Sequence, residues 1–127
     1  MSSEVLKYIA DIMAALGLPY DFIMWNGEQV PDPYWIGEYA ETEPMSEDGL
    51  QESTFILTGT TRESWFSLEQ AKTKIKNRFP PVNGDTAILD NGSGVAIFYS
   101  DAFPVPTEDG DYKRIQINLR IKEWSVN

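Results

Sequence analysis

The residue types that carry out acid–base, nucleophilic or metal chemistry are unevenly supplied in this chain of 127 residues. It has twenty aspartates and glutamates, but it has no histidine and no cysteine. That absence removes Ser-His-Asp and Cys-His catalysis, thiolate ligands and nearly all zinc sites. Twenty carboxylates make chance pairs inevitable, so Asp109 and Asp111 carry no weight as a glycosidase pair, and Asp109-Gly110-Asp111 predicts a turn. We therefore expect no catalytic residues, no metal site, no cofactor and no enzymatic activity.

Two loop-like stretches have compositions that could bind ions. Glu41–Glu52 is acidic, but a calcium loop needs acids at alternating positions, then a glycine and a distant glutamate, and Ser46-Glu47-Asp48-Gly49 does not supply that pattern. Asp90-Asn91-Gly92-Ser93-Gly94 is rich in glycine, but it lacks the Gly-Lys-Ser/Thr of a phosphate loop and no helical pattern follows it. The first stretch predicts an exposed loop and the second predicts the turn of a hairpin.

Four aromatic residues close together in the sequence, Trp25, Tyr34, Trp35 and Tyr39, could bind a ligand. Aromatic side chains near turns stack on sugars or nucleobases, but they also anchor cores and protein interfaces. All three interpretations stay open from the sequence.

A cationic face is the other candidate. In Tyr112–Trp124, apolar residues alternate with polar ones, which predicts a half-buried strand because successive side chains of a strand point to opposite faces. The apolar set is Ile115, Ile117, Leu119 and Ile121, and the polar set is Arg114, Gln116, Asn118, Arg120 and Lys122.

The net charge of −10 comes entirely from the first half of the chain. Residues 1–60 hold eleven acids and one base, Lys7, whereas residues 61–127 hold nine of each. This balance argues against binding DNA or an anionic membrane over a broad surface. No apolar run approaches the roughly 18 residues of a membrane helix, and the first residues lack the pattern of a signal peptide. We expect no membrane association and no specific nucleic-acid binding.

Two helices are predicted. Ser3–Leu16 repeats apolar residues at three- and four-residue steps, and Gly17 should end it. Thr60-x-x-Glu63 resembles a capping box that would open a second helix, which Pro80-Pro81 should stop. The apolar stripe of this second helix is Trp65, Leu68, Ala71, Ile75 and Phe79.

The remaining apolar stretches predict strands and their connections. A strand at Tyr20–Trp25 ends in the turn signal Asn26-Gly27. Ser53–Thr61 predicts a strand with both faces covered, and Phe103–Pro106 predicts an extended crossing segment. The other predicted strands are Tyr34–Thr42, Asp85–Leu89, Val95–Tyr99 and Tyr112–Trp124. Together they predict one domain, 1–127, of the α+β class. We expect a mixed, mostly antiparallel sheet of about five to six strands with two helices on one face.

Three segments together resemble a known type of protein. They are Trp25–Tyr39, Ser53–Thr61 and Ile88–Gly94. They are similar to small head-to-tail morphogenesis proteins of long-tailed phages and prophages, of the tail-terminator or tail-completion type. The resemblance implies a structural protein made in the cytoplasm of a bacterial host and located in the virion. It further implies a ring of six subunits that caps the tail tube, meets the head connector and lets DNA pass through its lumen. No functional residue of that family can be matched to a position here.

A ring is built from contacts in which one patch of a subunit meets a different patch of the next. We therefore predict a subunit interface in which the cationic strand faces acids of the neighbour. The predicted residues are Arg114, Gln116, Arg120 and Lys122, opposite Glu38, Glu41, Glu43 and Glu47, with Trp35 as a further contributor. Two other classes stay open: a small module that binds a glycan or peptide on the aromatic group, and an acidic inhibitor that mimics DNA.

Overall fold

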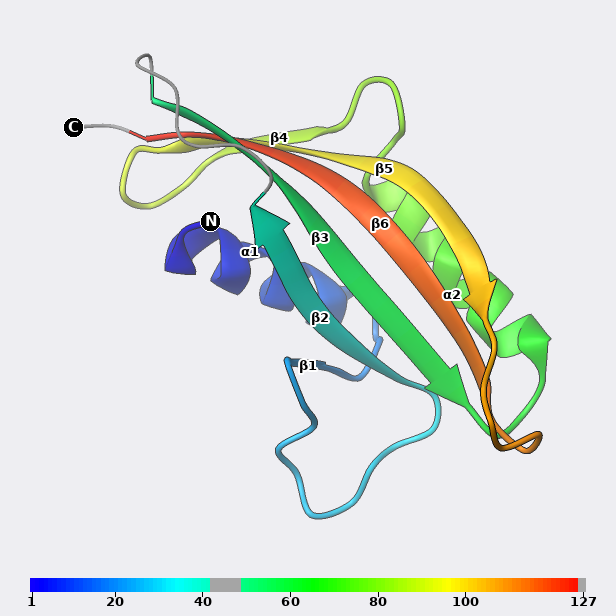
Figure 1. Ribbon diagram of the computed structural model, residues 1–127. Helices are drawn as coiled ribbons and strands as arrows, with labels where there is room; N and C mark the ends of the chain where they lie inside the picture. The colour runs from blue at the N-terminus through cyan, green and yellow to red at the C-terminus, as the bar shows by residue number, and fades with distance from the viewer. Residues whose placement is uncertain (42–48, 126–127) are drawn as a thin grey trace.

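The structure is a computed structural model that describes residues 1–41 and 49–125 (Figure 1). It has two helices and six strands, which confirms the predicted α+β class. Their order is α1 (Ser3–Ala15), β1 (Tyr20–Phe22), β2 (Tyr34–Glu41), β3 (Leu50–Thr61), α2 (Trp65–Arg78), β4 (Asp85–Ile88), β5 (Gly94–Val105) and β6 (Lys113–Trp124).

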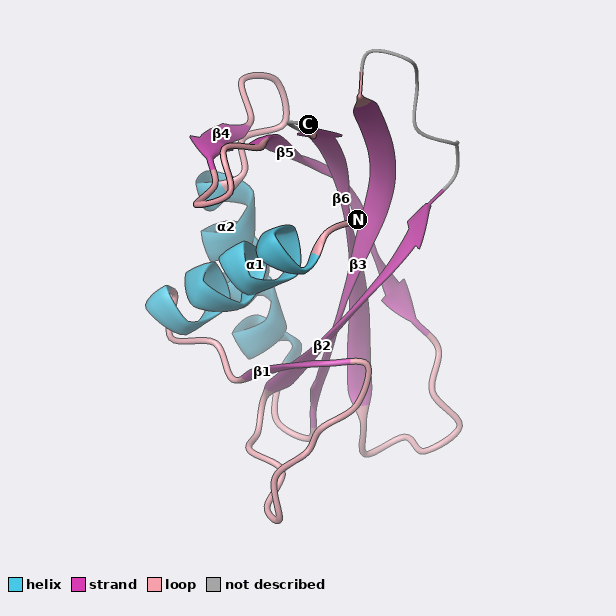
Figure 2. Ribbon diagram, turned by 90° about the vertical axis from the view of Figure 1, so that its left-hand side faces the viewer, coloured by secondary structure: helices cyan, strands magenta, loops and turns pink. Residues whose placement is uncertain are grey.

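The six strands form one curled sheet in the order β1-β2-β3-β6-β5-β4. Only β1 and β2 are parallel; every other neighbouring pair is antiparallel, so the sheet is mixed as predicted. The two central strands, β3 and β6, pair along their whole length, from Leu50 opposite Trp124 to Thr61 opposite Lys113. Figure 2 shows that both helices lie on the same side of the sheet. Within residues 1–41 and 49–125, no helix lies on the opposite side of the sheet (Figures 1 and 2).

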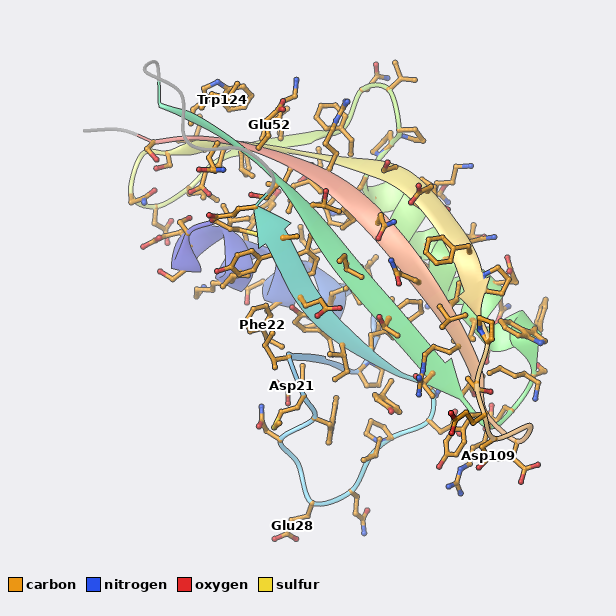
Figure 3. All side chains as sticks on the ribbon, in the orientation of Figure 1. Asp21, Phe22, Glu28, Glu52, Asp109 and Trp124 are labelled. Carbon is orange, nitrogen blue, oxygen red and sulfur yellow. The ribbon has the colours of Figure 1, made fainter. Side chains whose placement is uncertain are left out.

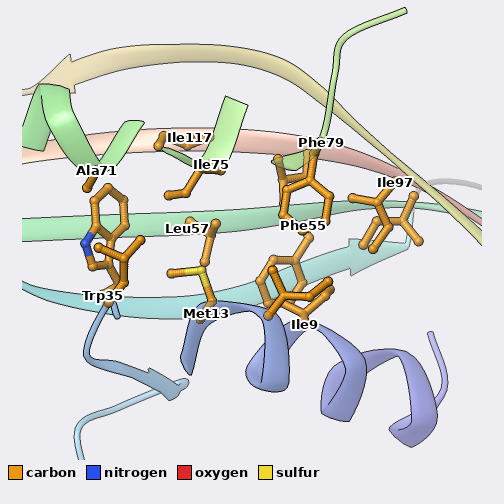
Figure 4. Close-up of a cluster of buried hydrophobic side chains, with 14 of the residues drawn as sticks. Ile9, Met13, Trp35, Phe55, Leu57, Ala71, Ile75, Phe79, Ile97 and Ile117 are labelled. Carbon is orange, nitrogen blue, oxygen red and sulfur yellow. The ribbon is translucent and has the colours of Figure 1, made fainter. Parts of the chain in front are cut away.

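The core lies between the helices and one face of the sheet (Figure 4). The odd-numbered residues of β2, β3 and β6 point into it, because side chains alternate along a strand. From the sheet come Trp35, Phe55, Leu57, Ile97, Ile115, Ile117, Leu119 and Ile121, and from the helices Val5, Ile9, Ile12, Met13, Leu68, Ala71 and Ile75, all of them buried. The prediction of two helices on one face of the sheet is thereby confirmed.

Trp35 fits into this core because glycine stands opposite it. A Cβ atom at Gly59, its partner on β3, would lie 2.6 Å from the indole ring, which is closer than real contacts allow. The Trp35 side chain is 0% exposed, and its Nε1 has no hydrogen-bond partner among the described residues. Trp35 is therefore a residue of the core.

The start of α1 follows the sequence, whereas the predicted start of α2 is wrong. Ser2 caps α1 through its Oγ, which accepts from the Val5 N–H at 3.3 Å. The supposed capping box belongs to the end of β3 instead: Thr61 Oγ1 donates to Asp32 at 2.5 Å and accepts from the Glu63 N–H at 3.0 Å. Helix α2 begins later, with Ser64 as its N-cap. Pairing with β6 holds this segment extended, so local capping does not decide its conformation.

Four strand predictions also need correction. β1 stops at Phe22 and runs parallel to β2, so Asn26-Gly27 does not close a hairpin. β3 starts at Leu50, so the end of the predicted loop Glu41–Glu52 is strand. Helices cover only one face of β3 (Figure 2). Finally, Phe103–Val105 is not a crossing segment but the end of β5, and it pairs with β6. β4 does not reach this part of β5, so the strand is at the edge of the sheet here and tolerates a proline. The hairpin between β4 and β5 is confirmed.

Candidate interface on the open face of the sheet

The side of the sheet that the helices leave uncovered faces the viewer in Figure 1, and we call it the open face. Its side chains are the even-numbered residues of β2, β3 and β6, together with Thr86, Ile88, Gly94, Ala96, Phe98, Asp101, Phe103 and Val105 of β4 and β5. The change from even to odd numbers in β5 comes from a register shift between Tyr99 and Asp101. This bulge returns the following side chains to the same face.

The predicted cationic residues all lie on this face. Arg114, Gln116, Arg120 and Lys122 form one line along β6, in the middle of the sheet. Glu38 lies on the same face, two strands away, in the row that joins it through Ile56 to Asn118. The sheet therefore brings five of the predicted interface residues onto one surface.

Each polar group of the β6 line already has a local contact. Arg114 Nε donates to Thr60 Oγ1 at 3.2 Å, Gln116 donates to Asn118 at 3.0 Å, and Lys122 Nζ lies 3.7 Å from a carboxylate oxygen of Glu52. The guanidinium of Arg120 lies 4.8 Å from the centre of the Phe98 ring. This ring contact holds the guanidinium in place. Within the described residues, Arg120 forms no ion pair, so its charge stays available for a partner.

The other predicted interface residues do not reach this surface. Trp35 is in the core, and its predicted role in an interface is wrong because Gly59 and the helices enclose it. Glu41 is odd-numbered and contacts the amino group of Met1. Glu43 and Glu47 lie outside the described residues.

The position of Glu38 affects the predicted geometry of assembly. If Glu38 of one subunit met the β6 cations of another, two open faces would have to meet each other. Such a contact uses the same patch on both subunits, which gives a two-fold pair and does not propagate around a ring. The charged pairing alone therefore does not account for a ring, and a second, different patch is needed.

The four aromatic residues do not form one platform. Trp25 and Tyr34 meet edge to face with ring centres 6.2 Å apart, and the Trp25 Nε1–H donates to the Gln29 carbonyl at 3.1 Å. Tyr39 stacks on Phe22 elsewhere, and Trp35 is in the core. Trp25 therefore lies in the segment between β1 and β2, Tyr34 and Tyr39 lie on β2, and Trp35 lies in the core.

The structure adds apolar residues to the candidate site that the sequence predictions did not include. On the open face, Trp124 is 40% exposed, Ile88 is 78% exposed and Phe103 is 43% exposed. Trp124 had a signal, because it continues the even-numbered line of β6 after Lys122. Ile88 had none, because the short stretch Asp85–Ile88 does not show which of its faces is covered.

Two of these residues border a hollow near one end of the sheet, which we call the Trp124 slot. Its volume is about 380 Å³, and it is lined by Thr86, Ala87, Ile88, Gly94, Val95, Ala96 and Trp124. Gly94 pairs with both Trp124 and Ile88 in the sheet, and a Cβ atom placed on it would lie 3.7 Å from the indole and 3.9 Å from the Ile88 side chain. The missing side chain of Gly94 thus opens a gap between two apolar walls.

Polar clusters away from the open face tie elements together. The Tyr8 hydroxyl donates to Asp85 at 2.5 Å, and Arg78 pairs with the other oxygen of Asp85, which links α1, α2 and β4. Desolvation by burial, together with this hydrogen bond to Asp85, raises the pKa of Tyr8. In the part of the chain that the structure describes, no group of three or more acidic side chains could hold a metal ion, and no helix is long and apolar enough to cross a membrane.

Comparison with known proteins gives no family assignment: no protein-family model matches the chain, and no curated protein matches it either.

Proposed function

We propose that this protein is a structural subunit of a phage or prophage virion, a tail-terminator-like protein that assembles into a ring at the head–tail junction. The ring caps the tail tube and contacts the head connector, and DNA passes through its lumen without sequence-specific binding. The protein acts by assembly and carries out no reaction. The resemblance of Trp25–Tyr39, Ser53–Thr61 and Ile88–Gly94 to that class suggested the proposal.

The observation that carries the proposal is the open face. In the part of the chain that the structure describes, one side of the six-stranded sheet has no helix over it, and that side combines cations on β6 with exposed apolar side chains at Trp124, Ile88 and Phe103. Isolated exposed hydrophobic residues are common, but apolar side chains rimmed by charges on an otherwise uncovered face mark protein contacts. This mixture fits a subunit that is partly covered by others.

The charge of the chain fits passage of DNA. A net charge of −10 repels phosphates, so a lumen lined by such subunits would let a nucleic acid slide without adhering. The divided aromatic group gives less support to a glycan-binding or peptide-binding module, because its four members share no surface. On the open face, Glu38, Glu52 and Asp101 are interspersed with Arg114, Arg120 and Lys122, which gives less support to an acidic mimic of DNA.

Negative-stain electron microscopy of the purified full chain tests the proposal. At high protein concentration and low salt, we expect closed rings with a central channel, and we expect added protein to decorate one end of isolated tails. A strict monomer under the same conditions, together with bare tail ends, would contradict the proposal.

A further inference from the structure

A closed ring requires two different patches that recognise each other, and the cationic line with Glu38 supplies only one face. A second exposed apolar group is therefore needed, away from the open face, with a shape and charge that match it. The segment between β1 and β2 provides one.

Ile23 and Met24 form this group, which we call the Ile23–Met24 pair. They are 58% and 62% exposed although both are large and apolar. They follow β1 directly, at the start of the segment that projects from the body of the molecule (Figure 1). No described side chain covers them enough to bury them.

The backbone presents this pair in a fixed conformation. Ile23 has a φ of 69°, an uncommon value for a β-branched residue that persists only where the surroundings enforce it. The Ile23 N–H donates to the Gly37 carbonyl at 2.9 Å, and the Met24 N–H donates to the Phe22 carbonyl at 2.8 Å. The Asp21 carboxylate accepts from the Asn26 backbone N–H at 2.9 Å and so closes the turn around the pair. These hydrogen bonds fix the backbone that carries the two exposed apolar side chains, which preorganises the pair for a contact.

The charges beside the two patches are opposite. The projecting segment 21–33 contains Asp21, Glu28 and Asp32 and no base. The Trp124 slot adjoins Lys122, which is opposite Ala96 of the slot and lies 3.7 Å from Glu52. Arg120, which forms no ion pair within the described residues, lies one row further along β6 and supplies the positive charge. Charge complementarity of this kind fixes the register of a contact and suppresses wrong pairings.

The two patches also lie far apart on the molecule. The slot is lined by β4, β5 and β6 at one edge of the sheet, whereas the pair follows β1 at the opposite edge. Figure 3 shows Trp124 well separated from Phe22, Asp21 and Glu28. A patch at one edge that fits a different patch at the other edge makes a head-to-tail contact, and such a contact closes into a ring when its rotation allows.

We propose that the partner in the Trp124 slot is a second copy of this chain, which inserts its Ile23–Met24 pair between Trp124 and Ile88. This inference rests on the proposed ring and names the two surfaces that form each junction. The gap above Gly94 takes an apolar side chain, while Lys122 and Arg120 face the acidic segment of the inserted loop.

Cross-linking between two single-cysteine variants tests the inference directly, because the natural chain has no cysteine. Met24→Cys protein is mixed with Ile88→Cys protein and treated with a short bis-maleimide. Val82→Cys replaces Ile88→Cys in the matched control, since Val82 is 86% exposed and lies outside the slot. We expect mixed dimers from Met24→Cys with Ile88→Cys at a yield at least ten times that of the control.

A slot-filling variant gives the second readout. In Gly94→Leu, the added side chain occupies the slot, and no left-handed backbone conformation opposes it. We expect assembly to weaken at least tenfold while the melting temperature of the monomer stays the same or rises. Met24→Asp should weaken assembly similarly, because it places a charge between apolar walls.

The outcomes separate the inference from the proposed function. Rings together with the Met24–Ile88 cross-link support both. Rings whose Met24–Ile88 yield equals that of the Val82 control, or whose Ile88→Cys protein links to itself, overturn the inference and leave the ring in place. A monomer at every concentration overturns both.

Discussion

The two faces of the sheet come from the same strands, yet they are covered differently. On β3, Leu57 points toward the helices and is 0% exposed, while its neighbour Ile56 points to the open face and is only half-buried. On β6, Ile117 lies in the core and Gln116 lies on the open face. The covered face gathers aliphatic and aromatic side chains into one cluster, whereas the open face mixes cations, acids, hydroxyls and isolated apolar groups. The first composition serves folding, and we infer that the second serves assembly.

Neighbouring substitutions on β3 should show the largest difference between the faces. Leu57→Ala leaves a cavity in the core, so we expect it to lower the free energy of unfolding by about 2–5 kcal/mol. Ile56→Ala removes a half-buried side chain and should cost about 1 kcal/mol or less. Urea unfolding of the monomeric protein measures both. Equal losses would mean that the open face is packed like the core.

Two glycines provide a smaller version of the same comparison. Gly59→Ala places a Cβ atom 2.6 Å from the Trp35 ring, and the resulting overpacking should cost about 1–3 kcal/mol. Gly94→Ala meets its nearest neighbour at 3.7 Å, so we expect it to be neutral or slightly stabilising because alanine costs less chain entropy in a strand. The melting temperatures of the two variants check this. A destabilised Gly94→Ala protein would show that the slot is already filled from within.

Charge reversal on the open face should separate folding from assembly. Arg120→Glu loses the contact with the Phe98 ring, worth about 0.5–1 kcal/mol at an exposed site, so the melting temperature should change little. Assembly should weaken at least tenfold. Lys7→Glu is the matched control, because it makes the same change of charge on α1, where Lys7 pairs with Asp11 at 3.0 Å. Sedimentation of both variants gives the answer, and a large loss of stability in Arg120→Glu would place that side chain in a structural role.

The smallest expected effect concerns Asp21, which holds the projecting segment. The Asn26 backbone N–H, the Phe22 backbone N–H and the Asn26 side chain donate to this carboxylate and lower its pKa below the ordinary value. Because the folded value is the lower one, the stabilising contribution is complete above the unfolded pKa, about 3.9, and is lost as the pH falls through the folded pKa. The NMR shift of the Asn26 amide should titrate with a midpoint below 3.9, and this titration should vanish in Asp21→Asn. A midpoint at or above 3.9 would contradict the hydrogen bonding of this turn.

Much of the fold could be predicted from periodicity. The alternation in Tyr112–Trp124 gave both faces of β6 correctly, and the three- and four-residue steps in Ser3–Leu16 gave α1. The errors occurred where pairing between distant segments overrides local signals. Thr60 and Glu63 are the residues of a capping box, but pairing with β6 keeps β3 extended through Thr61. The Thr61 hydroxyl donates to Asp32. Phe103–Val105 contains a proline, yet it pairs with β6 because it lies at an edge.

The candidate site was predictable only in part. The line of Arg114, Gln116, Arg120 and Lys122 followed from alternation, because a strand places every second residue on one face. Trp35 was misplaced because an aromatic side chain in a strand has the same local signal in a core as at an interface, and only Gly59 on β3 decides between them. The Trp124 slot needed the sheet itself, since its walls come from β4, β5 and β6.

The most direct test of assembly is the mass of the purified full chain, measured by sedimentation velocity across a range of protein concentrations. We expect one discrete closed species at high concentration, whose mass is a whole multiple of the 14.4 kDa chain, six by the resemblance to tail terminators. We also expect Gly94→Leu and Arg120→Glu to shift this species toward the monomer. A sedimentation coefficient of a 14.4 kDa monomer at every concentration and at low salt would contradict assembly.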